Sequence, residues 1–78
     1  MPYSQRLKNL ENQKQGIESL IADREQLSNL CIQDIKAETN FAKRTQLNIQ
    51  MENYLTEITE LYDKVDEIHK QINKLKST

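Results

Sequence analysis

The chain has 78 residues, 36% of them hydrophobic and 29% charged, and its 11 basic and 12 acidic residues leave a formal net charge of −1. This length allows at most one domain, and the evenly mixed charges provide no basic field for nucleic acid or an anionic bilayer. No apolar run approaches the roughly 20 residues that span a membrane, the first residues lack the apolar core of a secretory signal, and a single cysteine cannot form an internal disulfide. We therefore expect a cytoplasmic protein without nucleic-acid or membrane partners.

A first helix is predicted from about Tyr3 to Ala37. Pro2 and Ser4 are residue types that start helices, and an apolar heptad repeat follows them. The repeat puts Leu10, Ile17, Arg24 and Cys31 at its a positions and Gln13, Leu20, Leu27 and Asp34 at its d positions. Gly16 costs about 1 kcal/mol relative to alanine inside a helix, so it is either a tolerated flaw or a break between two shorter helices.

The three residues 38–40 are the best candidate for a turn. Asn40 is a suitable N-cap for a second helix from Phe41 to about Lys76, and such short connections join antiparallel neighbours. One signal disagrees with a turn here. The acidic Asp34 and Glu38 lie at a helix C-terminus and the basic Lys43 and Arg44 at a helix N-terminus, where the macrodipole disfavours each charge. An uninterrupted helix of about 110 Å is the alternative that would explain these charges.

The second half of the chain has a stricter repeat, with apolar residues at every a position from 51 to 72 and every d position from 47 to 75. In an antiparallel pair a meets d, so the numbers of contacting residues share one sum, which is 78 for a turn at residue 39. This pairing predicts an all-α helical hairpin whose core is Leu10, Ile17, Leu20, Leu27, Cys31, Leu47, Met51, Tyr54, Ile58, Leu61, Val65 and Ile68. It also places Asp34 opposite Arg44 as a polar pair near the turn, and Arg24 opposite Tyr54, where a guanidinium can stack on a ring.

One flank of this hairpin is apolar in sequence and the other is mostly polar. The apolar flank consists of the e positions Leu7, Ile21, Ile35, Phe41, Leu55 and Tyr62. Full burial of a large apolar side chain contributes about 1.5–3 kcal/mol, so six of them on one flank favour self-association. We expect a homo-oligomer, with a dimer forming a four-helix bundle as its simplest form; the alternative is that these side chains thicken the core within the hairpin.

No combination of residues predicts catalysis, a cofactor or a metal ion. The chain has one histidine, one cysteine and one glycine, so it lacks the residues for a nucleophile–base pair, a ligand cluster or a phosphate-binding loop. We interpret His69 as a surface residue and Cys31 as a small apolar residue of the core. The chain is therefore predicted not to be an enzyme.

The stretch from Arg24 to about Leu75 resembles a known family. The resemblance is carried by Gln26-Leu27-Ser28, by Glu38-Thr39-Asn40 at the turn, and by Arg44 and Gln46-Leu47 leading into Ile49-Gln50-Met51-Glu52 and a heptad tail. It is similar to the helical-hairpin effector-associated domains of bacterial, notably cyanobacterial, signalling and conflict proteins, which accompany STAND-type NTPases, caspase-like and CHAT proteases and TIR domains. Phe41 departs from the pattern, since a proline or small residue often follows the cap there.

The resemblance implies an adaptor that associates with a like helical domain on another protein. Together with the apolar flank, it predicts that residues 1–78 form one non-enzymatic, homotypic interaction module. Two alternatives stay open at this point. One is a structural or regulatory coiled coil made by a continuous helix, and the other is a small helical inhibitor or chaperone that binds a different protein.

Overall fold

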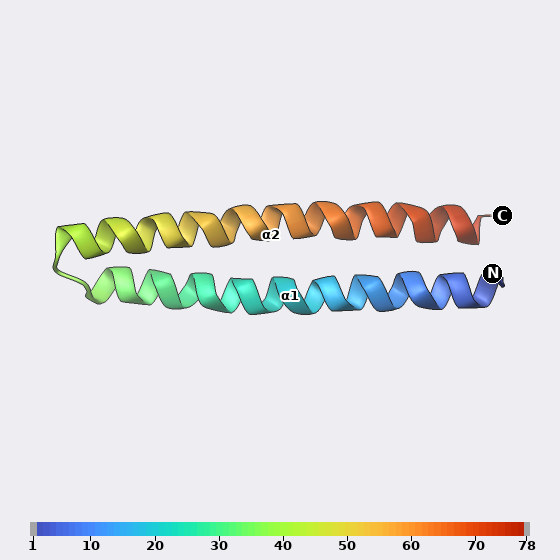
Figure 1. The fold of residues 1–78 in the computed structure, drawn as a ribbon, viewed down its shortest axis with the longest axis horizontal. Coiled ribbons are helices and arrows are strands. Elements are labelled where there is room, and N and C mark those ends of the chain that lie inside the picture. Colours follow the sequence, from blue (N-terminus) through green and yellow to red (C-terminus); the bar gives the residue numbers. More distant parts are fainter. Residues whose placement is uncertain (1, 78) are drawn as a thin grey trace.

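The computed structural model describes residues 2–77 and shows two long antiparallel helices (Figure 1). Helix α1 spans Tyr3–Ala37 and helix α2 spans Phe41–Lys76, with the extended residues 38–40 between them. The Cα atoms occupy 57 × 15 × 14 Å, about half the length of an unbroken helix of this chain. The predicted hairpin and both pairs of helix bounds are confirmed, and the uninterrupted helix is excluded.

Two side chains stabilise the turn by accepting hydrogen bonds from backbone N–H groups at the start of α2. The Asn40 side-chain oxygen accepts a 3.0 Å hydrogen bond from the backbone N–H of Lys43, which confirms the predicted cap. The Glu38 carboxylate accepts a 3.0 Å bond from the backbone N–H of Asn40. The carboxylate of Glu38, which the macrodipole disfavours at the end of α1, therefore lies at the N-terminus of α2, where the macrodipole favours a negative charge.

Helix α1 continues through Gly16 without a break. The residue has no positive φ, and a Cβ built there would have no atom within 4 Å. Gly16 is thus a tolerated flaw in an exposed position, and the three-segment arrangement that it suggested is wrong.

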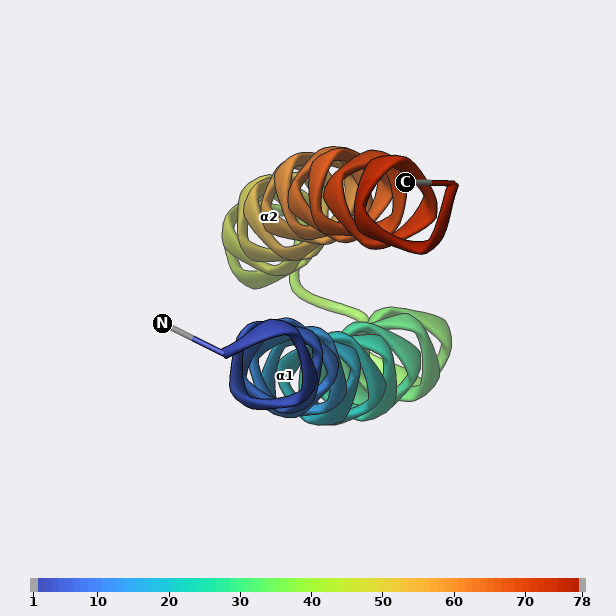
Figure 2. The same cartoon turned by 90° about the vertical axis from the view of Figure 1, so that its right-hand side faces the viewer.

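The face by which α2 packs against α1 is the one that the sequence predicts. The a and d positions of α2 are the ones withdrawn from solvent, and Ile58, Ile68 and Ile72 among them are buried. The two helices cross at a small angle and wind gently around each other (Figure 2). This shape is typical of an antiparallel coiled coil.

Helix α1 is rotated by about 50° from its predicted orientation, because it packs through its a and e positions instead of a and d. Ile21, Ser28 and Cys31 are its buried residues, whereas Leu20 is 45% exposed. Over the whole helix three of the five e residues are apolar (Leu7, Ile21 and Ile35), against two of the five d residues (Leu20 and Leu27), so the e positions offer a slightly more apolar seam. The withdrawn positions then pair at a constant sum of 82 instead of 78, as for Ile21 with Leu61.

This rotation corrects several predictions. Leu20 does not belong to the core, and Leu27 lies half-buried at its edge. Ile21 is a core residue and not part of an exposed flank, and Leu7 and Ile35 are half-buried along the same seam. The remaining predicted core residues are buried or half-buried, as expected: Leu10, Ile17, Cys31, Leu47, Met51, Tyr54, Ile58, Leu61, Val65 and Ile68.

Candidate interaction surface

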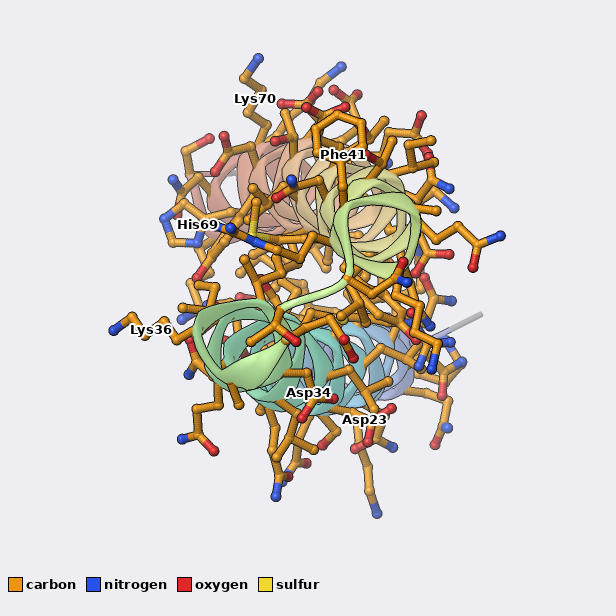
Figure 3. The ribbon with its side chains drawn as sticks, turned by 90° about the vertical axis from the view of Figure 1, so that its left-hand side faces the viewer. Asp23, Asp34, Lys36, Phe41, His69 and Lys70 are labelled. Carbon is orange, nitrogen blue, oxygen red and sulfur yellow. The ribbon has the colours of Figure 1, made fainter. Side chains whose placement is uncertain are left out.

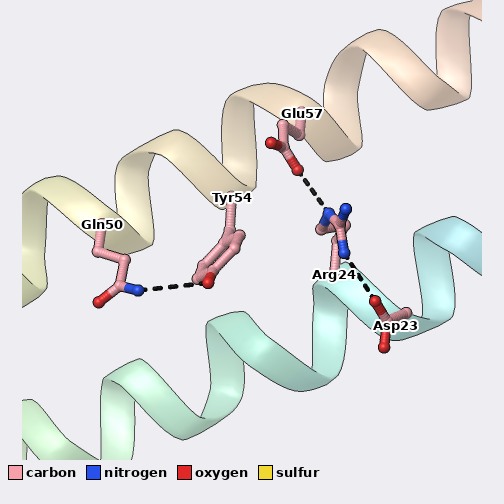
Figure 4. A network of polar contacts seen from close by, with 5 residues as sticks. All are labelled: Asp23, Arg24, Gln50, Tyr54 and Glu57. Carbon is pink, nitrogen blue, oxygen red and sulfur yellow. Dashed lines mark hydrogen bonds and ion pairs between the residues drawn. The ribbon is translucent and has the colours of Figure 1, made fainter.

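Arg24 of α1 forms a polar contact with α2. Its Nε donates a 2.7 Å hydrogen bond to Glu57 of α2, and its terminal nitrogen donates a 2.7 Å bond to the neighbouring Asp23 (Figure 4). The predicted stacking of Arg24 on Tyr54 is wrong, because the Tyr54 ring does not lie over the guanidinium (Figure 4). Tyr54 points toward α1 one turn closer to the hairpin turn, and its hydroxyl accepts a 3.3 Å bond from Gln50.

The register explains this change of partner. A sum of 82 puts Arg24 level with Ile58, next to Glu57, and puts the small buried Ser28 level with the large Tyr54. A small residue opposite a large one lets the two helices keep an even spacing. Hydrophobic patterning does not reveal Ser28 as a core residue, because serine counts as polar in any such pattern.

Asp34 and Arg44 do not form the predicted pair near the turn. Both side chains are exposed, and neither takes part in an ion pair within residues 2–77. The register shift moves Asp34 away from Arg44 and into a groove lined by Lys43 and Gln50. The loop itself is stabilised by Asn40 and Glu38 instead.

One flank of the hairpin is fixed in register by a hydrogen bond between Tyr62 and Glu25. The Tyr62 hydroxyl donates to the Glu25 carboxylate over 2.9 Å. This bond, and then the negative charge of the same carboxylate, raise the pKa of the Tyr62 hydroxyl above its ordinary value of 10.0. One heptad closer to the turn, the same register places Ile32 of α1 level with Leu55 of α2.

The turn half of this flank carries exposed apolar side chains. Phe41 is 84% exposed, Tyr62 49%, Leu55 47% and Ile32 37%. Viewed from the turn, Phe41 projects away from α1 (Figure 3). We call these four residues the open edge. The open edge keeps the three α2 residues of the predicted flank and loses its three α1 residues to the seam. It gains Ile32, which the rotation of α1 moves from the outer face of the helix to this flank.

The other half of the same flank is charged. Glu11 and Glu18 of α1 line one groove with His69 and Lys76 of α2. The register set by Tyr62 and Glu25 brings Glu18 level with His69 and Glu11 level with Lys76. Within residues 2–77, none of the four takes part in an ion pair or a side-chain hydrogen bond.

Other chemistry-bearing residues are scattered. Cys31 is a free thiol buried in the seam, and His69 is exposed. Across residues 2–77, no three histidine, cysteine, aspartate or glutamate side chains are grouped so that they could hold a metal ion. Neither α1 nor α2 is apolar enough over a sufficient length to cross a membrane.

Comparisons of the chain with known protein families, with curated proteins and with solved structures find no match.

Proposed function

We propose that this chain is a non-enzymatic, homotypic interaction module of the cytoplasm, which assembles with a second copy of itself through the open edge. Two hairpins packed on that flank would form a four-helix bundle. A reducing compartment is supported by the single cysteine, which lies unpaired in the seam.

The observation that carries the proposal is how little apolar surface the hairpin hides. Among residues 2–77, the five buried hydrophobic residues are Ile21, Cys31, Ile58, Ile68 and Ile72, and none is completely enclosed. In the same described stretch, eight large hydrophobic residues are exposed: Tyr3, Leu20, Leu30, Ile32, Phe41, Ile49, Leu55 and Tyr62. Four of the eight make up the open edge, and each would gain about 1.5–3 kcal/mol by full burial.

The total surface supports the same conclusion. The hairpin exposes 5972 Å², whereas a compact monomer of 9.2 kDa exposes about 4,900 Å². The excess of about 1,000 Å² is close to the roughly 800 Å² that each partner buries in a standard protein interface. A second copy of the hairpin therefore has the right size to cover it.

The resemblance to effector-associated domains agrees with this role. In that family a hairpin on one protein associates with a like hairpin on another and brings the attached enzymes together. We extend the proposal accordingly: a related helical domain on a second protein is the partner that would use the open edge in place of a second copy.

Sedimentation velocity from about 5 to 500 μM tests the proposal. The parent is expected to dimerise, and Leu55→Glu to stay monomeric, because a carboxylate would have to be buried in the centre of the interface. Asn53→Glu is the matched control, since it adds the same charge to an exposed position on the opposite face of α2 and should dimerise like the parent. A parent that stays monomeric throughout this range overturns the proposal, and a monomer that binds a different protein one-to-one would favour the inhibitor or chaperone class.

A further inference from the structure

We infer that the second copy docks in the same direction as the first, so that both turns lie at one end of the dimer and α1 of each copy packs against α2 of the other. The inference rests on the proposed self-association and adds the orientation of the partner and the residues that select it. The selecting residues are Glu11 and Glu18 on α1 and His69 and Lys76 on α2.

The flank divides into an apolar half and a charged half. Ile32, Leu55 and Phe41 lie toward the turn, whereas the four charged or polar residues share one groove toward the free end. The charged half is itself divided, because Glu11 and Glu18 of α1 are carboxylates while His69 and Lys76, the α2 residues level with them, carry an imidazole and an ammonium group. Lys14 of α1 also lines this groove, level with the uncharged Asn73. A partner surface must therefore offer apolar residues toward the turn. Toward the free end it must place basic groups opposite α1 and carboxylates opposite α2.

A same-direction dimer satisfies both. A two-fold axis parallel to the long axis of the hairpin brings α1 of one copy against α2 of the other at equal height. Glu18 then meets His69 of the second copy, and Glu11 meets Lys76. In the apolar half, Ile32 meets Leu55 of the second copy. Each contact occurs twice, and none pairs like charges.

An opposite-direction dimer with full overlap fails on both counts. It would pack α1 against α1, bringing Glu18 near Glu25 of the second copy and Glu11 near Ile32. Like charges in contact across an interface select against that arrangement. It would also place the apolar Phe41 level with the charged Lys76 of the second copy.

An opposite-direction dimer in which only the turn halves overlap avoids these contacts but buries too little. The whole flank, 57 Å long and about 15 Å wide, measures roughly 850 Å², close to the 800 Å² of a standard interface. Half of it falls well below that value. Only full overlap in the same direction combines sufficient area with matched charges.

Distance measurement on spin labels tests the orientation directly. With Cys31→Ala to remove the native thiol, Gln5→Cys places one label on the outer face of α1 near the free end. The same-direction dimer separates the two labels by about the width of a four-helix bundle, roughly 30 Å. Full overlap in the opposite direction gives about 50 Å, and partial overlap gives about 80 Å or more, at 1.5 Å per residue along the helix.

Charge reversal provides a second readout whose sign depends on the orientation. One chain carries Glu11→Lys and Glu18→Lys, and the other carries His69→Glu and Lys76→Glu. In the same-direction dimer each variant alone should dimerise at least tenfold more weakly than the parent, and an equimolar mixture should form a heterodimer. The preference should shrink at 0.5 M salt, where charges are screened beyond about 4 Å.

Opposite results would overturn the inference. In an opposite-direction dimer, Glu18→Lys faces Glu25 of the second copy, so the first variant would dimerise more tightly than the parent. Label distances of 50 Å or more would lead to the same conclusion. Both outcomes require a dimer, so they are distinct from a monomeric parent, which overturns the proposed function itself.

Discussion

Helices α1 and α2 are almost equal in length, yet they use their heptad repeats differently. Every a and d position of α2 that faces α1 is apolar, and the helix packs through that stripe. The a/d stripe of α1 contains polar residues, and the helix packs through a and e instead. A complete stripe thus determines its own orientation, whereas an incomplete one is oriented by the helix that it meets.

The largest expected effect tests the rotation of α1 with two neighbouring residues. Ile21→Ala should lower the free energy of unfolding by about 2–4 kcal/mol, because it removes a buried side chain and leaves a cavity. Leu20→Ala, at a site 45% exposed, should cost less than about 1 kcal/mol. Urea denaturation followed by circular dichroism, at one fixed protein concentration, measures both.

The predicted a/d seam would give the reverse order, with Leu20→Ala the more harmful change. Equal effects of the two substitutions would also contradict the rotation. Fixing the concentration matters because dimerisation stabilises the folded chain by mass action.

A smaller effect concerns the single glycine of α1. Gly16→Ala should raise the free energy of unfolding by about 1 kcal/mol, since the new methyl group meets open space and the unfolded chain loses freedom. Gln15→Ala is the matched control and should change the free energy of unfolding by only a few tenths of a kcal/mol, because glutamine is already a good helix former. Loss of stability in Gly16→Ala would show that α1 is not a regular helix at this position.

The smallest expected effect is on the pH dependence and involves the bond from α2 back to α1. The folded state keeps the Tyr62 proton at a pH where the unfolded chain releases it. The contribution of this bond to the free energy of unfolding is therefore fully present below pH 10.0 and is lost as the pH rises above it. Glu25→Gln should lower the pKa of Tyr62, as read from tyrosinate absorbance in a chain with Tyr3→Phe and Tyr54→Phe. An unchanged pKa of Tyr62 in Glu25→Gln would show that the Tyr62–Glu25 hydrogen bond does not fix the register of this flank.

Several features of the fold follow from local chemistry alone and were predictable. The helix bounds, the Asn40 cap and the α2 seam each depend on residues close together in sequence. The orientation of α1 depends on a comparison between two imperfect stripes, which the heptad rule applied to one helix does not make. Its correct seam includes Lys14, Ser28 and Arg24, which hydrophobic patterning counts against a core.

For the same reason, only the α2 residues of the candidate surface could be predicted from the sequence. Phe41, Leu55 and Tyr62 belong to α2, whose orientation was right, and they are exposed. Leu7, Ile21 and Ile35 belong to α1 and moved inward when that helix turned. The acidic row that α1 presents beside the open edge could not be recognised until the true register was known.

The start of α1 and the end of α2 lie at the same pole of the hairpin, and the turn lies at the other (Figure 1). A pulling force applied between the two chain ends would therefore peel the helices apart heptad by heptad from that pole, with few contacts resisting at any moment. A force between one chain end and the turn would load the whole seam in shear. The direction of mechanical load, more than the sum of the contacts, decides how firmly this hairpin holds.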